Sequence, residues 1–469
     1  MNLRITPKHI PEIDPAFTPA ILWNKAYREL CAHTPGVAPL TLSLARPDST
    51  ASSFHTACLP HTGEFTALNK TYVERIVKFL LWARGGNKLF LSGAHAEPLA
   101  ALLRDIYRDG GERAFDDDFV KKLFDTGLEI QVVATEADLP KDATGHLPLG
   151  RNLDGCRIGF DLGGSDRKCA ALIDGKVVFS EEVKWDPYFQ PDPQYHYDGI
   201  QETLKLAAAH LPRVDAIGGS SAGVYINNTV RVSSLFRGIK DPDVFEQRVK
   251  NIFLDIAKEW DVPFEVLNDG DVTALAGSMN MGKNAVLGVA MGTSVAGGYV
   301  DPEGRVTNWL NELAFVPLDY RANGPADEWS GDLGCAVQYF SQQGVVRLLP
   351  LAGIQLPPEM KPPEQLETLQ KLMADHDPRA LKVYEAIGVS FGYFLAHLAE
   401  FYIYEQLLIM GRVTSGEGGA VIIEKARQVL ADEFPTLRIN LVVPDEKDKR
   451  HGQAIAAASL ASRKVKCED

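Results

Sequence analysis

Two glycine turns in this chain, each between apolar runs, combine residues that could bind phosphate groups. The first is Asp161-Leu162-Gly163-Gly164-Ser165, which follows the apolar residues 158–160 and precedes a second apolar run, 169–173, and the turn signal Asp174-Gly175. The pattern predicts three strands joined by two tight turns. Asp161 could hold a hydrated Mg²⁺. Unpaired backbone N–H groups in the first turn could face phosphate oxygens, and the residues predicted to supply them are Gly163, Gly164 and Ser165.

Residues 285–300 repeat this arrangement. The apolar run 285–291 leads into Gly292-Thr293-Ser294, and a second apolar run, 295–300, follows. Either hairpin alone is equally consistent with a glycine-rich turn that binds nothing. Two such hairpins, each with a hydroxyl residue at its tip, favour a duplicated fold that closes on a nucleotide from both sides.

A candidate base lies between the two turns. The strand predicted at 264–267 ends in Asn268-Asp269, and residues 272–279 then show helical spacing. Ligands of α/β folds bind where strands lead into helices. An Asp at a helix start is also a common cap, and the motif alone does not separate these interpretations.

Two further loops of small residues follow predicted strands. The strand at 215–218 leads into 219–223, where Ser221 and Gly223 either admit a ligand or simply form a tight turn. The strand at 406–410 leads into the glycine loop Gly411–Gly419 and then a helix, which suits a nucleotide although single glycine loops are weak evidence.

The bulk composition narrows the function classes. The 469 residues should form two or three domains. The net charge of −14 argues against nucleic-acid and anionic-membrane partners, because both require a basic surface. The six scattered cysteines lack a C-x-x-C pair and are typical of reduced thiols. With neither a signal peptide nor an apolar run of membrane length, the sequence predicts a cytoplasmic protein.

The order of predicted elements divides the chain into three parts. Residues 1–150 alternate helices and strands and carry no chemistry-bearing motif, so they predict an accessory α/β domain. After a polar linker, residues 155–284 predict a small lobe with the first turn and Asp269. Residues 285–469 predict a large lobe with the second turn and the Gly411 loop, ending in an alanine-rich helix at 452–462.

With these motifs in order, residues 155–462 resemble the ROK family of sugar kinases and related repressors. The resemblance implies an actin-like (ribonuclease H-like) duplicated two-lobe α/β kinase fold, with residues 1–150 added. It also implies ATP and Mg²⁺ as cofactors, with Asp161 at the metal. The implied phosphate and adenosine contacts are Gly163, Gly164, Ser165, Gly292, Thr293, Ser294 and Gly411. Asp269 would be the catalytic base, and Asn268, Glu312, Gln338, Ser221 and Gly223 would bind the sugar.

The chain departs from the family pattern around its zinc motif. Phe315 stands where the family has a His, and Cys335 alone remains of three Cys. One thiolate cannot replace four zinc ligands, so we expect no structural zinc. The Glu that ends the motif is also absent, and only a shift of one residue lets Gln338 replace it.

The leading hypothesis is ATP-dependent phosphorylation of a hexose-type hydroxyl. The rival hypothesis is a non-catalytic sugar sensor that uses the same cleft, favoured by the lost zinc motif and disfavoured by the retained Asp269. A scaffold built on residues 1–150 has no positive sign in the sequence. The sugar and the oligomeric state, including whether the chain forms a homodimer, stay open.

Overall fold

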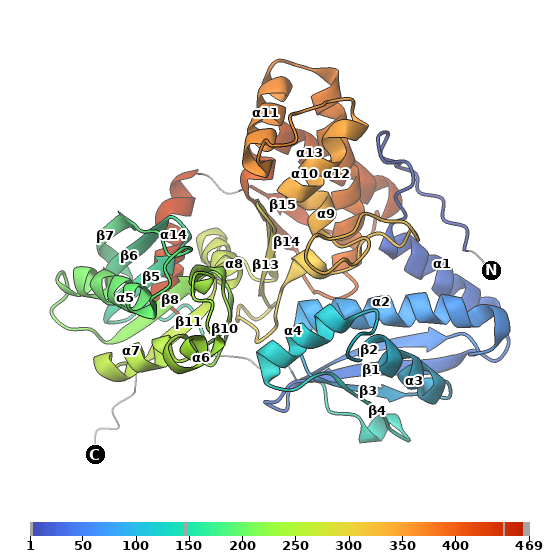
Figure 1. The fold of residues 1–469 in the computed structure, drawn as a ribbon, viewed down its shortest axis with the longest axis horizontal. Helices are drawn as coiled ribbons and strands as arrows, with labels where there is room; N and C mark the ends of the chain where they lie inside the picture. The colour runs from blue at the N-terminus through green and yellow to red at the C-terminus, as the bar shows by residue number, and fades with distance from the viewer. Residues whose placement is uncertain (1–2, 144–148, 444–445, 463–469) are drawn as a thin grey trace.

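The computed structural model describes residues 3–143, 149–443 and 446–462. Three sheets, each with helices packed on it, are the cores of three separate parts of the molecule (Figure 1). We call them the N-terminal unit, the small lobe and the large lobe. Within the described residues, no helix is both long and apolar enough to cross a membrane.

The small lobe is built on a five-stranded sheet of order β11-β8-β5-β6-β7. Its strands are β5 (Cys156–Leu162), β6 (Asp166–Ile173), β7 (Lys176–Lys184), β8 (Ala216–Ser221) and β11 (Phe264–Asn268). The three predicted strands of the first hairpin are therefore present. β8 extends beyond the predicted strand, so the expected loop at 219–223 begins three residues late. β8 extends to Ser221 because it lies between β5 and β11, and Ser221 pairs with both Leu162 and Asn268.

Helices and a short hairpin complete the small lobe. They are α5 (Pro193–Ala208), β9 (Val224–Ile226), β10 (Thr229–Val232), α6 (Pro242–Val244) and α7 (Ile252–Trp260). Asp192 caps α5 by accepting a hydrogen bond from the backbone of Gln194, with Pro193 in the first turn, where a missing N–H costs nothing. A π-helical segment, Phe245–Val249, lies between α6 and α7.

The large lobe contains a four-stranded sheet of order β13-β12-β14-β15. Its strands are β12 (Val286–Met291), β13 (Val295–Val300), β14 (Gln406–Met410) and β15 (Asn440–Val442). Its helices are α8 (Asp269–Met281), α9 (Val337–Phe340), α10 (Gln342–Leu351), α11 (Pro362–Ala374), α12 (Pro378–Leu398) and α13 (Glu417–Glu433). Gly270 and Gly298 let α8 lie directly on β13, since a Cβ on Gly298 would stand 2.0 Å from the Gly270 carbonyl oxygen.

The N-terminal unit has its own sheet, of order β2-β1-β3-β4. Its elements are α1 (Ala20–His33), β1 (Ala38–Ala45), β2 (Ala51–Cys58), α2 (Thr66–Arg84), β3 (Lys88–Ser92), α3 (Ala96–Ile106), α4 (Ala114–Phe124) and β4 (Glu129–Val132). β2 was not predicted, because its Ser, Thr and His residues hide the apolar alternation. Pairing with β1 along its whole length makes it a strand.

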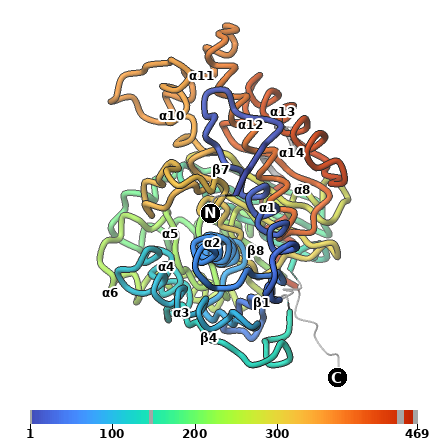
Figure 2. Tube along the Cα trace, turned by 90° about the vertical axis from the view of Figure 1, so that its right-hand side faces the viewer, coloured from blue at the N-terminus to red at the C-terminus, as the bar shows by residue number. Residues whose placement is uncertain are grey.

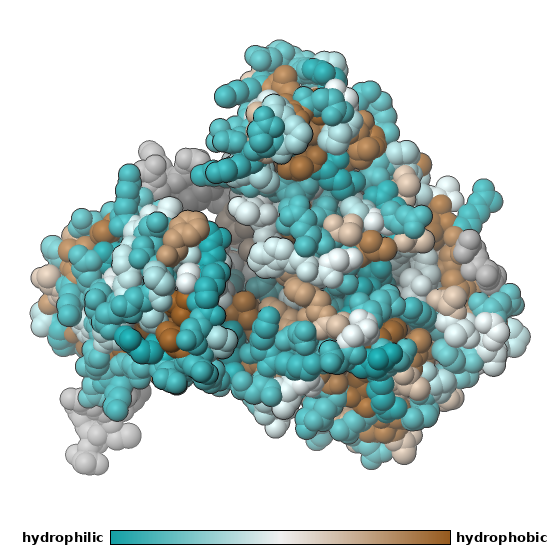
Figure 3. Space-filling view, in the orientation of Figure 1, coloured by the Kyte–Doolittle hydropathy of each residue, from teal (hydrophilic) through white to brown (hydrophobic). Residues whose placement is uncertain are grey.

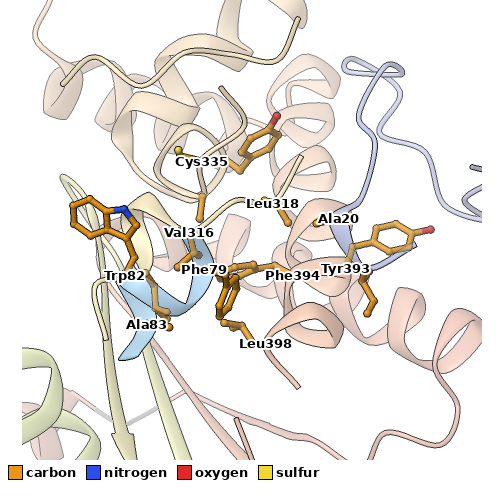
Figure 4. Close-up of a cluster of buried hydrophobic side chains, with 14 of the residues drawn as sticks. Ala20, Phe79, Trp82, Ala83, Val316, Leu318, Cys335, Tyr393, Phe394 and Leu398 are labelled. Carbon is orange, nitrogen blue, oxygen red and sulfur yellow. The ribbon is translucent and has the colours of Figure 1, made fainter. Parts of the chain in front are cut away.

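The N-terminal unit and the large lobe share one continuous hydrophobic core. Phe79 of α2 lies beside Phe394 of α12 (Figure 4), and both belong to the same cluster of buried residues as Trp82, Val316 and Leu318. The segment before α1 lies across α12 and α13 (Figure 2), where His9 bonds Asp432. The N-terminal unit and the large lobe are therefore held together by a shared apolar core, and not by a linker alone.

The alanine-rich C-terminal helix, α14 (Glu446–Ala458), returns to the small lobe. The predicted division placed it in the large lobe, but it packs between α8 and the small-lobe sheet (Figure 1). Two strand glycines allow this contact. A Cβ on Gly159 would lie 1.8 Å from the Ala454 carbonyl oxygen, and one on Gly218 would lie 1.8 Å from that of Ala457. Small residues on both sides explain the alanine-rich composition.

Candidate active site

Three parallel strands of the small lobe end at one edge of its sheet. Leu162 of β5 pairs with Ser221 of β8, which pairs with Asn268 of β11. The first glycine turn, the 222–223 loop and Asp269 therefore leave the sheet side by side. The polar side chains at these ends thus share one edge, which in α/β sheets is where ligands bind.

Asn268 links two of these strand ends. Its side-chain oxygen accepts a hydrogen bond from the Gly270 amide at 2.8 Å and so caps α8. Its side-chain nitrogen donates to the Gly223 carbonyl oxygen at 2.7 Å. Ser221, by contrast, is buried and bonds the Tyr225 hydroxyl. The cap of α8 is therefore Asn268 and not Asp269, and it fixes the start of α8 beside the Gly223 loop.

Four carboxyl groups gather around the start of α8. They belong to Asp161, Asp269, Asp271 and Glu312. Burial raises the pKa of Asp269 to about 6, with the charge of Asp161 as a second cause. Burial likewise raises the pKa of Glu312 to about 7, with Asp269 contributing, and that of Asp271 to about 8. Like charges in a half-buried site disfavour ionisation, so this cluster suits proton transfer.

A pH dependence follows from Asp269 as a base. Its ionised form accepts the proton, so kcat/KM should rise as pH increases through about 6 and level off above. Initial rates of ADP release between pH 5 and pH 8 measure this, and Asp269→Asn should remove that limb of the profile. A flat profile in the wild-type protein would contradict the assignment.

The first glycine turn keeps backbone donors for a ligand. The Gly163 amide donates to the Asp166 carbonyl oxygen at 2.9 Å, and its carbonyl oxygen accepts from the Trp185 indole. In the described structure, the amides of Gly164 and Ser165 donate no hydrogen bond. Gly164 must stay small, because a Cβ there would stand 2.0 Å from the Tyr188 hydroxyl oxygen.

Asp161 is buried below this turn. Its carboxylate accepts a hydrogen bond from the Ser220 hydroxyl at 2.6 Å and lies 3.7 Å from the Lys168 ammonium. Burial raises its pKa, and Asp166 adds to this shift. The Oδ2 oxygen of Asp161 therefore has only the more distant Lys168 ammonium as a partner among these two groups. Magnesium binds proteins through one or two carboxylates plus waters and phosphates, and this carboxyl fits that use.

The second glycine turn lies at the corresponding edge of the large-lobe sheet. β12 and β14 are parallel, with Ala290 paired to Met410, so the 292–294 turn and Gly411 leave the sheet together. Gly292 donates to the Ser294 carbonyl oxygen and accepts from the Gln342 amide, both at 2.9 Å. Thr293 and Ser294 form the rest of the turn.

A cavity of about 420 Å³ lies between α8, the large-lobe sheet and α14, and neither the 163–165 turn nor the 292–294 turn lines it. Asp269, Gly411, Arg412 and Ser415 line it, together with the α14 residue Gln453. Its walls are otherwise largely glycines and apolar side chains of α8 and the large-lobe sheet. A pocket of this size with few polar groups is typical of a small-molecule site. We call it the nucleotide cavity.

Gly411 supports a prediction about this cavity. Its φ is +102°, and a Cβ would stand 2.2 Å from the Met291 carbonyl oxygen, whereas Gly416 has φ of +73° and nothing within 4 Å. Both Gly→Ala changes cost roughly 1–3 kcal/mol of backbone strain, but only Gly411→Ala must also displace the end of β12. We expect ATP affinity to fall about tenfold in Gly411→Ala, equivalent to ~1.4 kcal/mol. Calorimetric titration with a non-hydrolysable ATP analogue measures it, and an equal loss in Gly416→Ala would contradict the clash.

A second cavity, of about 490 Å³, is lined by residues that flank Asp269 in the chain. Asn268, Asp271 and Gly223 line it. Residues of the N-terminal unit and the 307–310 segment complete its wall, and we call it the inter-domain cavity. Figure 3 shows a mostly hydrophilic face that is hollowed between the small lobe and the rest of the molecule.

The N-terminal unit positions Glu312. The last carbonyl groups of α2, on Trp82, Ala83 and Arg84, accept hydrogen bonds from the amides of 310–312. The last carbonyl groups of a helix have no partner within the helix, and the loop that carries Glu312 supplies these hydrogen bonds for α2. The sequence gives no local signal for this contact, because 228 residues separate Arg84 from Glu312 (312 − 84).

Gln338 lies apart from this site. It is buried in α9, and its side chain donates a hydrogen bond to the Gln343 side chain at 2.7 Å. Its backbone carbonyl oxygen accepts a hydrogen bond from the Arg347 guanidinium. It lines neither the nucleotide cavity nor the inter-domain cavity. No contact of Gln338 with the carboxyl cluster occurs among the described residues, so its predicted sugar contact stays a prediction.

Aromatic rings and ion pairs fill the region where the resemblance would place zinc. Phe315 stacks on Trp82 of α2 with ring centroids 4.2 Å apart. Lys78, wholly buried, lies 2.8 Å from Asp116 and also pairs with Asp332, which Arg113 contacts as well. In the part of the chain that the structure describes, no three His, Cys, Asp or Glu side chains are placed to hold a metal ion.

Comparison with solved structures identifies the fold. ROK hexokinase from Thermus thermophilus is similar over 65% of this chain and 97% of that chain, with a TM-score of 0.53 and 18% identity. A ROK family transcriptional regulator, a homologue of the E. coli Mlc protein, is similar over 66% of this chain and 79% of that chain, with a TM-score of 0.50 and 18% identity. No protein-family model and no curated protein matches the sequence. The predicted actin-like two-lobe fold is confirmed.

Proposed function

We propose that this protein transfers a phosphoryl group from ATP to a hydroxyl of a sugar or a related polyol. The observation that carries the proposal is the position of Asp269. Asp269 lines the nucleotide cavity, and the preceding residue, Asn268, lines the inter-domain cavity. A base between two cavities is what transfer between two bound substrates requires.

The described residues suggest a division of roles. Free amides of Gly164 and Ser165, with the 292–294 turn, would hold phosphate oxygens, and Gly411 would let the adenosine approach the backbone. Magnesium, when bound beside Asp161, would neutralise phosphate charge. Asp269 would accept the proton of the attacking hydroxyl. Asn268, Glu312 and the Ser221–Gly223 loop would orient the acceptor, while Gln338 would need to move to reach it.

A sugar-binding regulator is the second candidate. One solved structure with this fold is a transcriptional regulator, and the zinc region is remodelled by contacts such as Phe315 on Trp82. The retained base favours the kinase. A regulator needs no carboxyl group with a pKa near 6 between two cavities.

A coupled ADP-release assay tests the kinase proposal. We expect ATP- and Mg²⁺-dependent ADP release with at least one acceptor from a panel of hexoses, N-acetylhexosamines and their acidic and phosphorylated derivatives. Calorimetric binding of the same panel runs in parallel. Acceptor binding without ADP release across the panel would favour the regulator.

A further inference from the structure

The inter-domain cavity is walled by three separate parts of the chain. Arg46, Asp48 and Arg84 come from the N-terminal unit, Arg231 from β10, and 307–310 from the large lobe. In the small lobe, the 223–228 segment and Asn268 complete the wall. A ligand there would contact all three bodies and lie beside the strand end that carries the base.

Residues lining this cavity hold a cluster of buried polar atoms without hydrogen-bond partners. Among the described residues, the unpartnered atoms are Nη1 of Arg84, Nε of Arg231, Nε1 of Trp309, Oγ1 of Thr307 and Oδ1 of Asn308. A buried polar group without a partner typically costs about 1–3 kcal/mol. Four of the five atoms can donate a hydrogen bond, so the cluster suits a ligand rich in acceptor oxygens.

Among the described residues, neither Arg46 nor Arg84 forms an ion pair with a carboxylate, although Asp48 lies close enough to act on the charge of Arg46. Arg84, 6% exposed, lies between the rings of Trp309 and Tyr402, with its guanidinium carbon 3.2 Å and 4.5 Å from their centroids. Arg46 donates only to neutral oxygens, including the Thr50 and Ser52 hydroxyls. Burial lowers the pKa of each to about 10, which leaves both charged at neutral pH.

The carboxyl groups that line the same cavity already have hydrogen-bond or ion-pair partners within the protein. Asp48 accepts hydrogen bonds from Thr50 and Asn308. Asp125 pairs with Arg231 at 2.8 Å, and Lys250 lies 3.7 Å away. Asp271 accepts from the Tyr299 amide and the Asn311 side chain, and its pKa is raised to about 8. Burial also raises the pKa of Glu265, which lies close to the Asn228 side chain. Of these carboxyl groups, Asp48 acts on the charge of Arg46, and none forms an ion pair with Arg84 among the described residues.

We propose that the inter-domain cavity binds an anionic substituent of the acceptor, a carboxylate or a phosphate, through Arg84 with Arg46 beside it. The inference rests on the proposed function, because it takes the cavity beside Asp269 to be the acceptor site. A guanidinium recognises carboxylate and phosphate oxygens through paired N–H donors. A neutral hexose would leave the charge of Arg84 without an ion-pair partner.

The test compares neutral acceptors with anionic ones of the same stereochemistry. For glucose, mannose and N-acetylmannosamine, binding of the parent sugar and of its matching aldonate, uronate and 6-phosphate is measured by calorimetry with a non-hydrolysable ATP analogue. ADP release is measured for each with ATP. We expect an anionic member to bind about 10–100-fold more tightly than its neutral parent, as hydrogen bonds to charged groups allow. Parents that bind as tightly as all their derivatives would overturn the inference.

Variants locate the effect. Arg84→Gln should remove the preference for the anionic member, and Arg84→Lys should keep part of it, because the charge stays but the planar fork is lost. Arg108→Gln, an exposed arginine of the same unit, serves as the control and should keep the full preference. Circular dichroism and the melting temperature check that each variant folds. A preference that survives Arg84→Gln in a folded protein would overturn the inference.

Three further results distinguish a charged acceptor from a separate anion, and this inference from the proposed kinase function. If sulfate added with a neutral hexose matches the affinity of the anionic member, the cavity takes a separate anion and the inference fails. If an anionic member binds in an Arg84-dependent way without any ADP release, the anion site is supported and the kinase function is not. If neutral and anionic acceptors release ADP with equal kcat/KM, the kinase function stands and the inference fails.

Discussion

Asp269→Asn should lower turnover by about 10²–10⁴-fold, the usual contribution of a positioned general base. The substitution keeps the shape of the side chain, and its oxygen can still accept from the Gly270 amide, as Asp269 does at 3.0 Å. The start of α8 should therefore stay in place. Binding of ATP and of the acceptor should change little, so the loss should fall on kcat rather than on KM.

Single-turnover and steady-state ADP release, together with calorimetric binding, measure this split. Asp255→Asn on the exposed face of α7 provides a matched control with the same change of charge. Undiminished turnover in Asp269→Asn would show that the base lies elsewhere. Loss of ATP binding in the same variant would point instead to a role in placing the nucleotide.

Lys78→Met should destabilise the protein by roughly 3–5 kcal/mol, because removing one partner of a buried ion pair leaves uncompensated charge. Lys78 is wholly buried, and its ammonium contacts both carboxylate oxygens of Asp116 at 2.8 Å and also Asp332. After the substitution Arg113 and the Trp82 indole remain near these carboxylates but cannot replace the lost charge.

The same helix supplies the control for this prediction. Lys70 forms an exposed pair with Glu112 at 2.7 Å, so Lys70→Met should change stability by no more than about 1 kcal/mol. Chemical denaturation of both variants measures the difference in the free energy of unfolding. Adding Asp116→Asn to Lys78→Met should recover part of the loss. Equal effects of Lys78→Met and Lys70→Met would contradict a structural role for the buried network.

Much of the two-lobe fold could be predicted because its signals are local. Apolar runs, glycine turns and the helix spacing after Asn268 locate β5, β6, β12, β13 and α8 within a few residues. Strand-end motifs could be assigned to one site because the ends of parallel strands meet at one edge. The motifs Asp161–Ser165 and Asn268-Asp269 meet in this way.

The contributions of the N-terminal unit could not be predicted. Arg46 and Arg84 stand in ordinary strand and helix patterns, and only tertiary packing brings them to the cavity beside Asn268. The stack of Phe315 on Trp82 likewise depends on residues 233 positions apart (315 − 82). Gln338 was chosen by its place in a motif, whereas its partners are set by α9 and α10.

The return of α14 to the small lobe has a consequence for synthesis on the ribosome. Among the described residues, α14 is the helix that packs on the sheet face bearing Gly159 and Gly218, and it is made after residues 269–443. At about 5–20 residues per second this interval lasts roughly 10–35 seconds. During it an apolar face and the unfinished nucleotide cavity stay open to water. Nascent chains of this protein should therefore engage chaperones that bind apolar surface, and should release them only once α14 has emerged.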